Sequence, residues 1–359
     1  MALARITIRG FKSIRALEAF ELKGLNLLIG ANGAGKSNFV DFFRFLNAYL
    51  QGPNNLDKFV RKNGKADAFL FNGPKATEEI FVHLESSPQP HDQYLLDLIL
   101  RPMLTGEFDS LLNEGPQRLR SGQANAGSYG SPSADPMDTS YESALKSFVY
   151  HFHDTSATAA MRRDQSLRDW RELKPDAGNI AAFLYRLRQT DKDRYAEIRY
   201  QVRLIAPYFD DFILEPEQSG PAELIRLEWR QKENSTPFQP YQFSDGTMRF
   251  ICLAAALLQP NPPGTIVIDE PELGLHPFAL GVLASMLRQA SGRSQIIVST
   301  QSASLLDNFE PEEVIVVDRE NGASRFRRLE ANPLQDWLQD YSLGQLWQKN
   351  VLDGSPVYE

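Results

Sequence analysis

The segment LNLLIGANGAGKSNFVD at residues 25–41 decides the fold. Residues 25–29 are apolar except for one asparagine and predict a buried strand. Gly30–Ser37 then matches the pattern G-x-x-x-x-G-K-[ST], and the apolar stretch at residues 39–50 predicts a buried helix. A glycine-rich turn between a strand and a helix N-terminus points backbone N–H groups at phosphate. The sequence therefore predicts a nucleotide site on an α/β fold.

The residues of this loop have separate expected roles. Lys36 would reach the β- and γ-phosphates, and the hydroxyl of Ser37 would ligate Mg²⁺. The nucleotide-binding residues predicted here are Asn32, Gly33, Ala34, Gly35, Lys36, Ser37 and Asn38. The alternative, a glycine-rich turn that binds nothing, fits poorly with both the full match and its strand–helix context.

A second apolar strand ends in two acids. Residues 265–268 are mainly β-branched and lead into Asp269 and Glu270. A buried strand would deliver Asp269 to the edge of the sheet, where its carboxylate would hold Mg²⁺ together with Ser37. Glu270 would then polarise the attacking water. Two adjacent acids favour a hydrolase of this type over a GTPase, which usually has one acid at this place.

Ser244-Asp245-Gly246-Thr247 stand at the start of an apolar helix that we expect over residues 246–259. The simplest interpretation is a helix N-cap at Ser244. The segment also resembles the signature motif of ABC-type ATPases, Leu-Ser-Gly-Gly-Gln, with Asp245 replacing a glycine and Thr247 replacing the glutamine. In that class the signature of one subunit contacts the γ-phosphate held by its partner. The resemblance therefore adds all four residues to the nucleotide-binding set.

Two further segments are similar to the same class. Pro271–Pro277 stand where the class has its D-loop, and Gln301 follows an expected strand where the class usually has a switch histidine. The catalytic residues that the resemblance implies are Glu270, Lys36 and Gln301. The class runs its first turn past the base and ribose, which implies that Arg9 and Lys12 contact the nucleotide.

Nearly the whole chain resembles the heads of ABC/SMC-type ATPases, and more narrowly the stand-alone bacterial AAA-type ATPases related to RecF and to the ATPase half of OLD nucleases. The resemblance implies ATP and Mg²⁺ as cofactors, hydrolysis of ATP, and a homodimer formed through the ATP sites. Its conformational change would be read by DNA or by an effector protein encoded nearby, in DNA repair or recombination or in anti-phage defence. The alternative is a regulatory module that ATP clamps without hydrolysis, and the amide at Gln301 favours it.

The predicted architecture is a P-loop NTPase with an ABC-ATPase-like head, a mixed β-sheet and an inserted, partly helical lid. Residues 1–85 and 223–345 would form the two parts of the head, residues 86–222 the lid, and residues 346–359 a tail. Residues 113–140 are rich in Gly, Ser, Pro and Asn and predict a mobile loop. Strands are expected at 4–9, 79–84, 94–100, 147–153 and 225–229, and helices at 178–189 and 191–206.

Composition narrows the class of protein. The chain has 359 residues, with 38 Lys and Arg against 46 Asp and Glu, and a formal net charge of −8. Its single cysteine, Cys252, excludes a disulfide framework, and its apolar neighbours predict a core position. No apolar run reaches the roughly 20 residues that cross a bilayer, and the N-terminus lacks the apolar block of a signal peptide. We expect a cytoplasmic protein without a membrane partner.

Histidines mark two other candidate sites. His151 and His153 lie on one expected strand with Asp154 after them, which would suit a metal ion in a metal-dependent nuclease. The alternative is a polar strand face. His276 would either approach the nucleotide of the opposite subunit or cap a turn.

A cluster of arginines around Trp170 has two interpretations. It would form a face for nucleic acid, or an ordinary solvated surface. Its members are Arg162, Arg163, Arg168 and Arg171.

Overall fold

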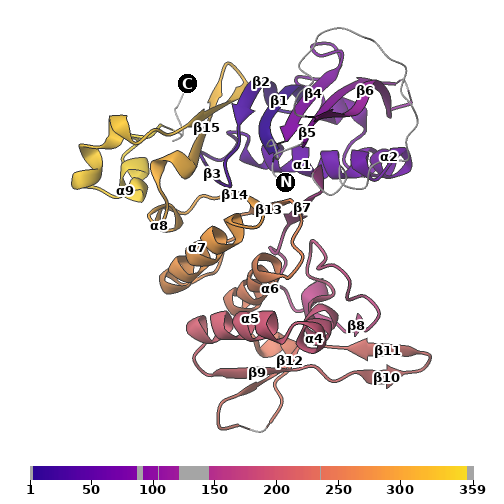
Figure 1. Ribbon diagram of the computed structural model, residues 1–359, viewed down its shortest axis with the longest axis vertical. Helices are drawn as coiled ribbons and strands as arrows, with labels where there is room; N and C mark the ends of the chain where they lie inside the picture. Colours follow the sequence, from indigo (N-terminus) through magenta and orange to yellow (C-terminus); the bar gives the residue numbers. More distant parts are fainter. Residues whose placement is uncertain (1–2, 87–91, 104, 121–144, 235, 354–359) are drawn as a thin grey trace.

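A computed structural model describes residues 3–86, 92–103, 105–120, 145–234 and 236–353 (Figure 1). A six-stranded sheet lies at its centre, and its strands are parallel except for one edge strand. In spatial order the strands are β16 (Ala323–Arg328), β15 (Val314–Glu320), β3 (Leu25–Ile29), β14 (Gln295–Ser299), β13 (Thr265–Asp269) and β7 (Ser147–Tyr150). The strands that precede the phosphate loop and the acid pair are therefore separated by β14 alone.

The N-terminal part of the chain forms a second, antiparallel sheet of five strands. Its strands are β2 (Ile14–Glu21), β1 (Leu3–Phe11), β4 (Ile80–Ser86), β5 (Asp92–Pro102) and β6 (Phe108–Arg120). It joins the central sheet at the β2–β16 corner, where the rings of Phe20 and Phe326 lie 6.4 Å apart. This corner brings residues near position 320 next to the phosphate loop.

Helices cover both faces of the central sheet. Helix α1 (Lys36–Leu50) lies between the two sheets, with α2 (Pro53–Lys62) beside it, and α6 (Asp245–Leu258) and α7 (Pro277–Ser291) lie on the opposite side of the central sheet (Figure 1). Beyond them is a lobe made of α4 (Ile180–Thr190), α5 (Lys192–Ile205) and five short strands. These are β8 (Gln165–Ser166), β9 (Phe209–Ile213), β10 (Glu217–Ser219), β11 (Ala222–Ile225) and β12 (Glu228–Gln231). Two short helices, α8 (Ala303–Leu306) and α9 (Leu343–Gln348), complete the C-terminal part.

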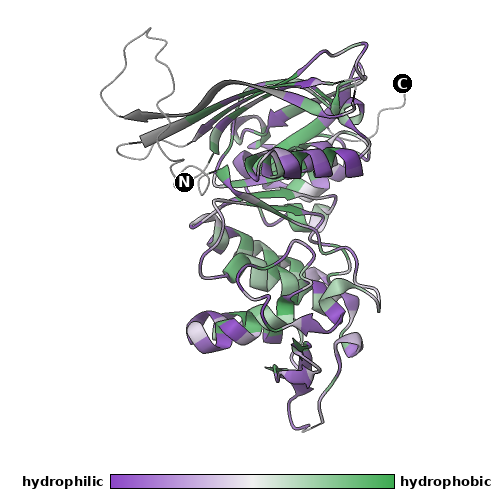
Figure 2. Cartoon of the chain, turned by 90° about the vertical axis from the view of Figure 1, so that its right-hand side faces the viewer, coloured by the Kyte–Doolittle hydropathy of each residue, from purple (hydrophilic) through white to green (hydrophobic). Residues whose placement is uncertain are grey.

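The central sheet separates two apolar cores. In β3, Leu27 and Ile29 point into the core below the sheet and Leu28 points into the core around α1. The other parallel strands alternate in the same way, because successive side chains of a strand leave opposite faces. The strands of this sheet and the helices below them are the most hydrophobic part of the chain (Figure 2). Burial on both faces explains why these strands read as continuous apolar runs.

The region expected as one lid, residues 86–222, is distributed over three places. β5 and β6 extend the five-stranded sheet, β7 forms the edge of the central sheet, and α4 and α5 belong to the lower lobe. Residues 113–120 are strand rather than loop, since backbone pairing with β5 does not require apolar side chains. The remainder of the expected mobile loop, residues 121–140, lies outside the described residues.

The local predictions differ from the structure at two strands. The strand expected over 147–153 ends at Tyr150, so the two histidines that follow it are in a loop. The strand expected over 225–229 is split into β11 and β12, which join different sheets. In the described part of the chain, no helix is both long enough and apolar enough to cross a membrane.

Candidate active site

The phosphate loop connects β3 to α1 through a backbone that only glycine adopts easily. Gly30, Gly33 and Gly35 have φ angles of 152°, 81° and 116°. Gly35 forms the N-cap of α1 in a left-handed conformation. Because side chains are absent at these turns, the loop can wrap closely and expose its N–H groups at the helix N-terminus.

Lys36 lies buried inside this loop, with 5% of its surface exposed. Its Nζ donates to the carbonyl oxygens of Gly30 at 2.7 Å and Ala31 at 3.0 Å. Burial lowers the pKa of Lys36, while the carboxylates of Glu270 and Asp269 act in the opposite direction. The lysine therefore lies close enough to the acid pair at the end of β13 to be influenced by its charge.

A serine from the far end of the chain braces the phosphate loop. The Oγ of Ser324, on β16, donates to the carbonyl of Ala34 at 2.6 Å and lies 2.7 Å from the Oγ of Ser13. Asn38 donates to the same Ser13 hydroxyl at 2.7 Å. No local pattern marks Ser324 as a site residue, because the hairpin that carries it reaches the phosphate loop only through the tertiary fold.

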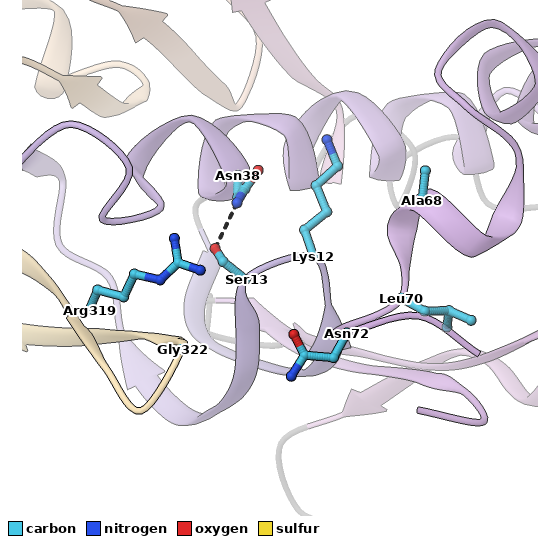
Figure 3. Close-up of a pocket in the computed structure, with 8 residues that line it drawn as sticks. All are labelled: Lys12, Ser13, Asn38, Ala68, Leu70, Asn72, Arg319 and Gly322. Atoms are coloured by element: carbon cyan, nitrogen blue, oxygen red, sulfur yellow. Dashed lines mark hydrogen bonds between the residues drawn. The ribbon is translucent and has the colours of Figure 1, made fainter. Parts of the chain in front are cut away.

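A pocket of about 410 Å³ opens beside this brace (Figure 3). Arg319 contributes to its wall and donates from Nη1 to the carbonyl of Gly33 at 3.3 Å, which connects the pocket to the phosphate loop. The full lining is Lys12, Ser13, Asn38, Ala68, Leu70, Asn72, Arg319 and Gly322. A pocket of polar side chains next to a phosphate loop has the size and position for the nucleoside part of a nucleotide. Arg319 and Asn72 were not among the expected site residues.

The two basic residues expected near the base and ribose are placed differently. Lys12 lines the pocket, but its Nζ pairs with Asp41 of α1 at 2.6 Å. Arg9 does not line the pocket; it pairs with Glu18 of the neighbouring strand at 2.6 Å, and both side chains are more than half exposed. Only Lys12 of the two is therefore within reach of a ligand in this pocket.

The acid pair lies where β13 ends. Asp269 is 8% exposed, and its Oδ1 has no hydrogen-bond partner among the described residues. A buried carboxylate oxygen without a partner is costly, and a bound cation would satisfy it. The exposed Ser37 is the first residue after the lysine in α1. Oxygen ligands of this kind are what Mg²⁺ prefers, so these residues fit the metal that the sequence predicts.

The loop after β14 contacts the acids directly. Gln301 donates from Nε2 to the Oε1 of Glu270, and its backbone N–H donates to the Oε1 of Glu272 at 2.8 Å. Burial raises the pKa of Glu272, and the hydrogen bond from Gln301 acts against that rise. Glu270 itself has a φ of 45°, an uncommon conformation outside glycine. Hydrogen bonds thus connect the loop after β14 to the acids that follow β13.

The expected signature residues begin α6. The Oγ of Ser244 accepts from the backbone N–H of Thr247 at 3.1 Å, which is the helix cap predicted from the sequence. Asp245 pairs with Arg162 at 2.9 Å. Among the hydrogen bonds described for these side chains, none connects them to the phosphate loop of their own chain.

Gly246 packs directly on the backbone of the D-loop. A Cβ at this position would lie 2.3 Å from the carbonyl oxygen of Gly274. Arg249 strengthens the same contact, because it donates to the carbonyl of Leu273 and, at 2.9 Å, to that of Phe152. The signature helix and the D-loop are therefore held as one block.

We expect Gly246→Ala to lower the free energy of unfolding by about 1–3 kcal/mol, because backbone atoms must move to admit the methyl group. Gly281→Ala is the matched control: its Cβ would meet only Asn308, at 3.8 Å, within α7. That substitution should stabilise by about 0.5–1 kcal/mol, the usual gain for alanine inside a helix. Urea denaturation of both variants measures the difference. Equal stability of Gly246→Ala and wild type would contradict the packing.

The histidines have structural partners. The Nε2 of His153 hydrogen-bonds with the carbonyl oxygen of Asp269 at 2.9 Å, and the rings of His151 and His153 lie 3.9 Å apart. Among the described residues, no three or more His, Cys, Asp or Glu side chains come together to hold a metal ion, so these histidines lack the third ligand that a zinc-type site needs. The Nδ1 of His276 accepts from the N–H of Phe278 at 3.2 Å, which caps α7.

The structure also shows the positions of Cys252 and of Arg162, one member of the arginine cluster. Cys252 is fully buried in the core, as predicted. Arg162 is not part of a solvated or nucleic-acid-binding face, since 4% of its side chain is exposed. Four acceptors surround its guanidinium and offset the cost of burying its charge.

The central sheet, the phosphate loop and the acid pair define a P-loop ATPase of the ABC/SMC class, similar to RecF. The chain belongs to the family described as "AAA domain, putative AbiEii toxin, Type IV TA system", which matches residues 25–307.

Curated relatives match one part of the chain. The DNA replication and repair protein RecF of Shewanella denitrificans is 29% identical over 133 residues, which are 33% of this chain and 37% of RecF. The chromosome partition protein Smc of Bacillus subtilis is 28% identical over 128 residues, 33% of this chain and 10% of Smc. The match thus spans little more than a third of RecF and a tenth of Smc.

Solved structures match nearly the whole chain. An Smc head bound to the C-winged helix domain of ScpA has a TM-score of 0.62 at 16% identity, over 94% of this chain and 100% of the head. The Smc head with an extended coiled coil, bound to the C-terminal domain of ScpA from Pyrococcus furiosus, has a TM-score of 0.58 at 16% identity. The match covers 94% of this chain and 99% of that head. At this identity the likeness establishes the fold.

Proposed function

We propose that the chain binds ATP with Mg²⁺, forms a head-to-head homodimer around two ATP molecules, and hydrolyses them. The observation that carries the proposal is the buried, unpartnered Oδ1 of Asp269, whose charge acts on the lysine of a complete phosphate loop. A carboxylate held in this way is suited to a cation. Membership of a P-loop ATPase family supports the same conclusion.

Each residue has a defined part in this proposal. Lys36 and the loop amides bind the phosphates, while Ser37 and Asp269 hold Mg²⁺, which when bound would neutralise charge on the phosphate oxygens. Glu270 takes a proton from the attacking water, and Gln301 orients its carboxylate through their hydrogen bond.

The signature residues complete the site of the opposite subunit in this proposal. Their position supports it: Asp245 is 69% exposed at the start of α6 and has no described bond to the phosphate loop of its own chain. A second copy would bring Ser244–Thr247 to that loop.

A second candidate function is an ATP-clamped switch with negligible turnover. The contact between Gln301 and Glu270 favours it, because an amide cannot exchange protons as a switch histidine does. In both candidates we propose that DNA or an effector protein reads the conformational change, in DNA repair, recombination or anti-phage defence. The relatives support a connection to DNA only through their own names.

The solution mass of Glu270→Gln, measured with and without ATP and Mg²⁺, tests the proposal. Removing the base should leave binding intact and stop turnover, so a dimer should accumulate with ATP. Ser244→Arg added to this variant is the matched control, and it should keep the chain monomeric. A monomeric Glu270→Gln that still binds ATP would contradict the homodimer. Phosphate release separates the candidates: if wild type releases no more than Glu270→Gln, the non-hydrolysing switch is correct.

A further inference from the structure

Arg162 ends a short helical turn, residues 160–162, in the segment between β7 and the lower lobe. All three nitrogens of its guanidinium make hydrogen bonds. Nε donates to the carbonyl of Thr155 at 2.9 Å, and Nη1 donates to the carbonyls of Pro240 and, at 3.1 Å, Phe243. Nη2 donates to the carboxylate of Asp245 at 2.9 Å. A buried arginine satisfied in this way has a fixed position.

Two of these acceptors flank one residue. Phe243 and Asp245 are the chain neighbours of Ser244, so the guanidinium holds the backbone carbonyl before the signature serine and the side-chain carboxylate of the residue after it. None of the hydrogen bonds described for Arg162 involves Ser244 itself, and the Oγ of Ser244 caps α6. The direction in which the serine faces the surface therefore depends on Arg162.

The turn that carries Arg162 is anchored independently. Met161 is 2% exposed, and its Sδ lies 3.9 Å from the Sγ of Cys252 in α6. Gln165 is 4% exposed, and its Oε1 accepts from the N–H of Ala181 at 2.8 Å. These contacts would hold the backbone of the turn even without the arginine side chain, so a substitution of Arg162 acts mainly on the signature loop.

Charge gives Arg162 a second effect. Asp245 is 69% exposed and stands beside Ser244, where the proposed dimer would place a triphosphate of the partner. An uncompensated carboxylate would repel that anion, whereas a carboxylate paired with a guanidinium repels it less.

We infer that Arg162 is a positioning residue of the signature half-site and acts on ATP bound by the opposite subunit. The inference rests on the proposed head-to-head site. It predicts that Arg162→Met binds ATP like wild type in its own phosphate loop, yet loses at least about tenfold in turnover, since the serine is misplaced and Asp245 is uncompensated.

Mixing variants tests whether the arginine acts across the dimer. Arg162→Met and Lys36→Ala should each be nearly inactive alone. In their mixed dimer, the intact phosphate loop of the first faces the intact signature of the second, so one of two sites works. An equal mixture should therefore recover about a quarter of wild-type turnover, because half of the dimers are mixed. A defect in folding alone would not be repaired by such mixing.

Ser244→Ala mixed with Lys36→Ala is the control for the proposed function, since alanine removes the serine hydroxyl without the bulk by which arginine would block the dimer. If this control recovers activity and Arg162→Met does not, the inference is wrong and the two-headed site stands. If neither recovers, the head-to-head site is wrong and the inference falls with it. Full activity of Arg162→Met alone would also overturn it. Should Arg162→Met fail to fold, Arg162→Lys keeps the charge without the three carbonyl bonds and is mixed in the same way.

Discussion

Lys36→Ala should weaken ATP binding by roughly 100-fold, measured by titration calorimetry with Mg²⁺ present. The lysine is held inside the phosphate loop by the carbonyls of Gly30 and Ala31, where its ammonium would reach the phosphates of a bound nucleotide. A hydrogen bond between charged groups in a desolvated site contributes about 1.5–3 kcal/mol, which is the basis of the expected change. Turnover should fall with binding, because the other catalytic groups then have no anchored substrate.

Lys36→Met is the matched control, since methionine keeps most of the buried volume and removes the charge. If the ammonium is what binds phosphate, both substitutions should weaken ATP binding alike. The free energy of unfolding should change little in the methionine variant, because burying an ammonium opposes folding while its two bonds favour it. Unchanged ATP affinity in either variant would refute the role of Lys36.

The phosphate loop and the acid pair could be predicted because each is written in consecutive residues. The strand Leu25–Ile29 leads directly to Gly30–Ser37, which holds three glycines and a lysine at a helix start, and a second apolar strand leads directly to Asp269. The helix cap at Ser244 was predictable for the same reason, because its hydrogen bond joins residues three apart. Local patterns of this kind depend only on residues that are close together in the sequence.

The supports of the site could not be predicted in this way. Ser324 lies 290 positions from the loop carbonyl that it holds, and Arg162 lies 83 positions from Asp245. The charge of Arg162 suggested a solvated or DNA-facing residue, but its guanidinium is surrounded by four acceptors from two separate segments, Thr155 and residues 240–245. Residues 86–222 were assigned to a single lid for a related reason. The residues of a strand such as β5 or β7 do not indicate which sheet the strand joins.

Gly35→Ala should unfold the loop region and abolish ATP binding, with a loss in the free energy of unfolding of about 3 kcal/mol or more. A Cβ at this position would lie 1.9 Å from the Oγ and 2.9 Å from the Cβ of Ser324, and the backbone has a φ of 116° that alanine adopts at a cost. Moving Ser324 aside would break its bond to Ala34, so either the helix start or the brace must give way.

Gly33→Ala separates the two causes. Its φ of 81° imposes a similar conformational strain, but a Cβ there would have no atom within 4 Å. We expect a loss of only about 1 kcal/mol, the usual cost of a left-handed conformation for alanine. Adding Ser324→Gly to Gly35→Ala should recover part of the lost stability by removing the nearest atoms. If Gly33→Ala and Gly35→Ala lost equal stability, strain alone would account for both, and the brace by Ser324 would have no part in shaping the phosphate loop.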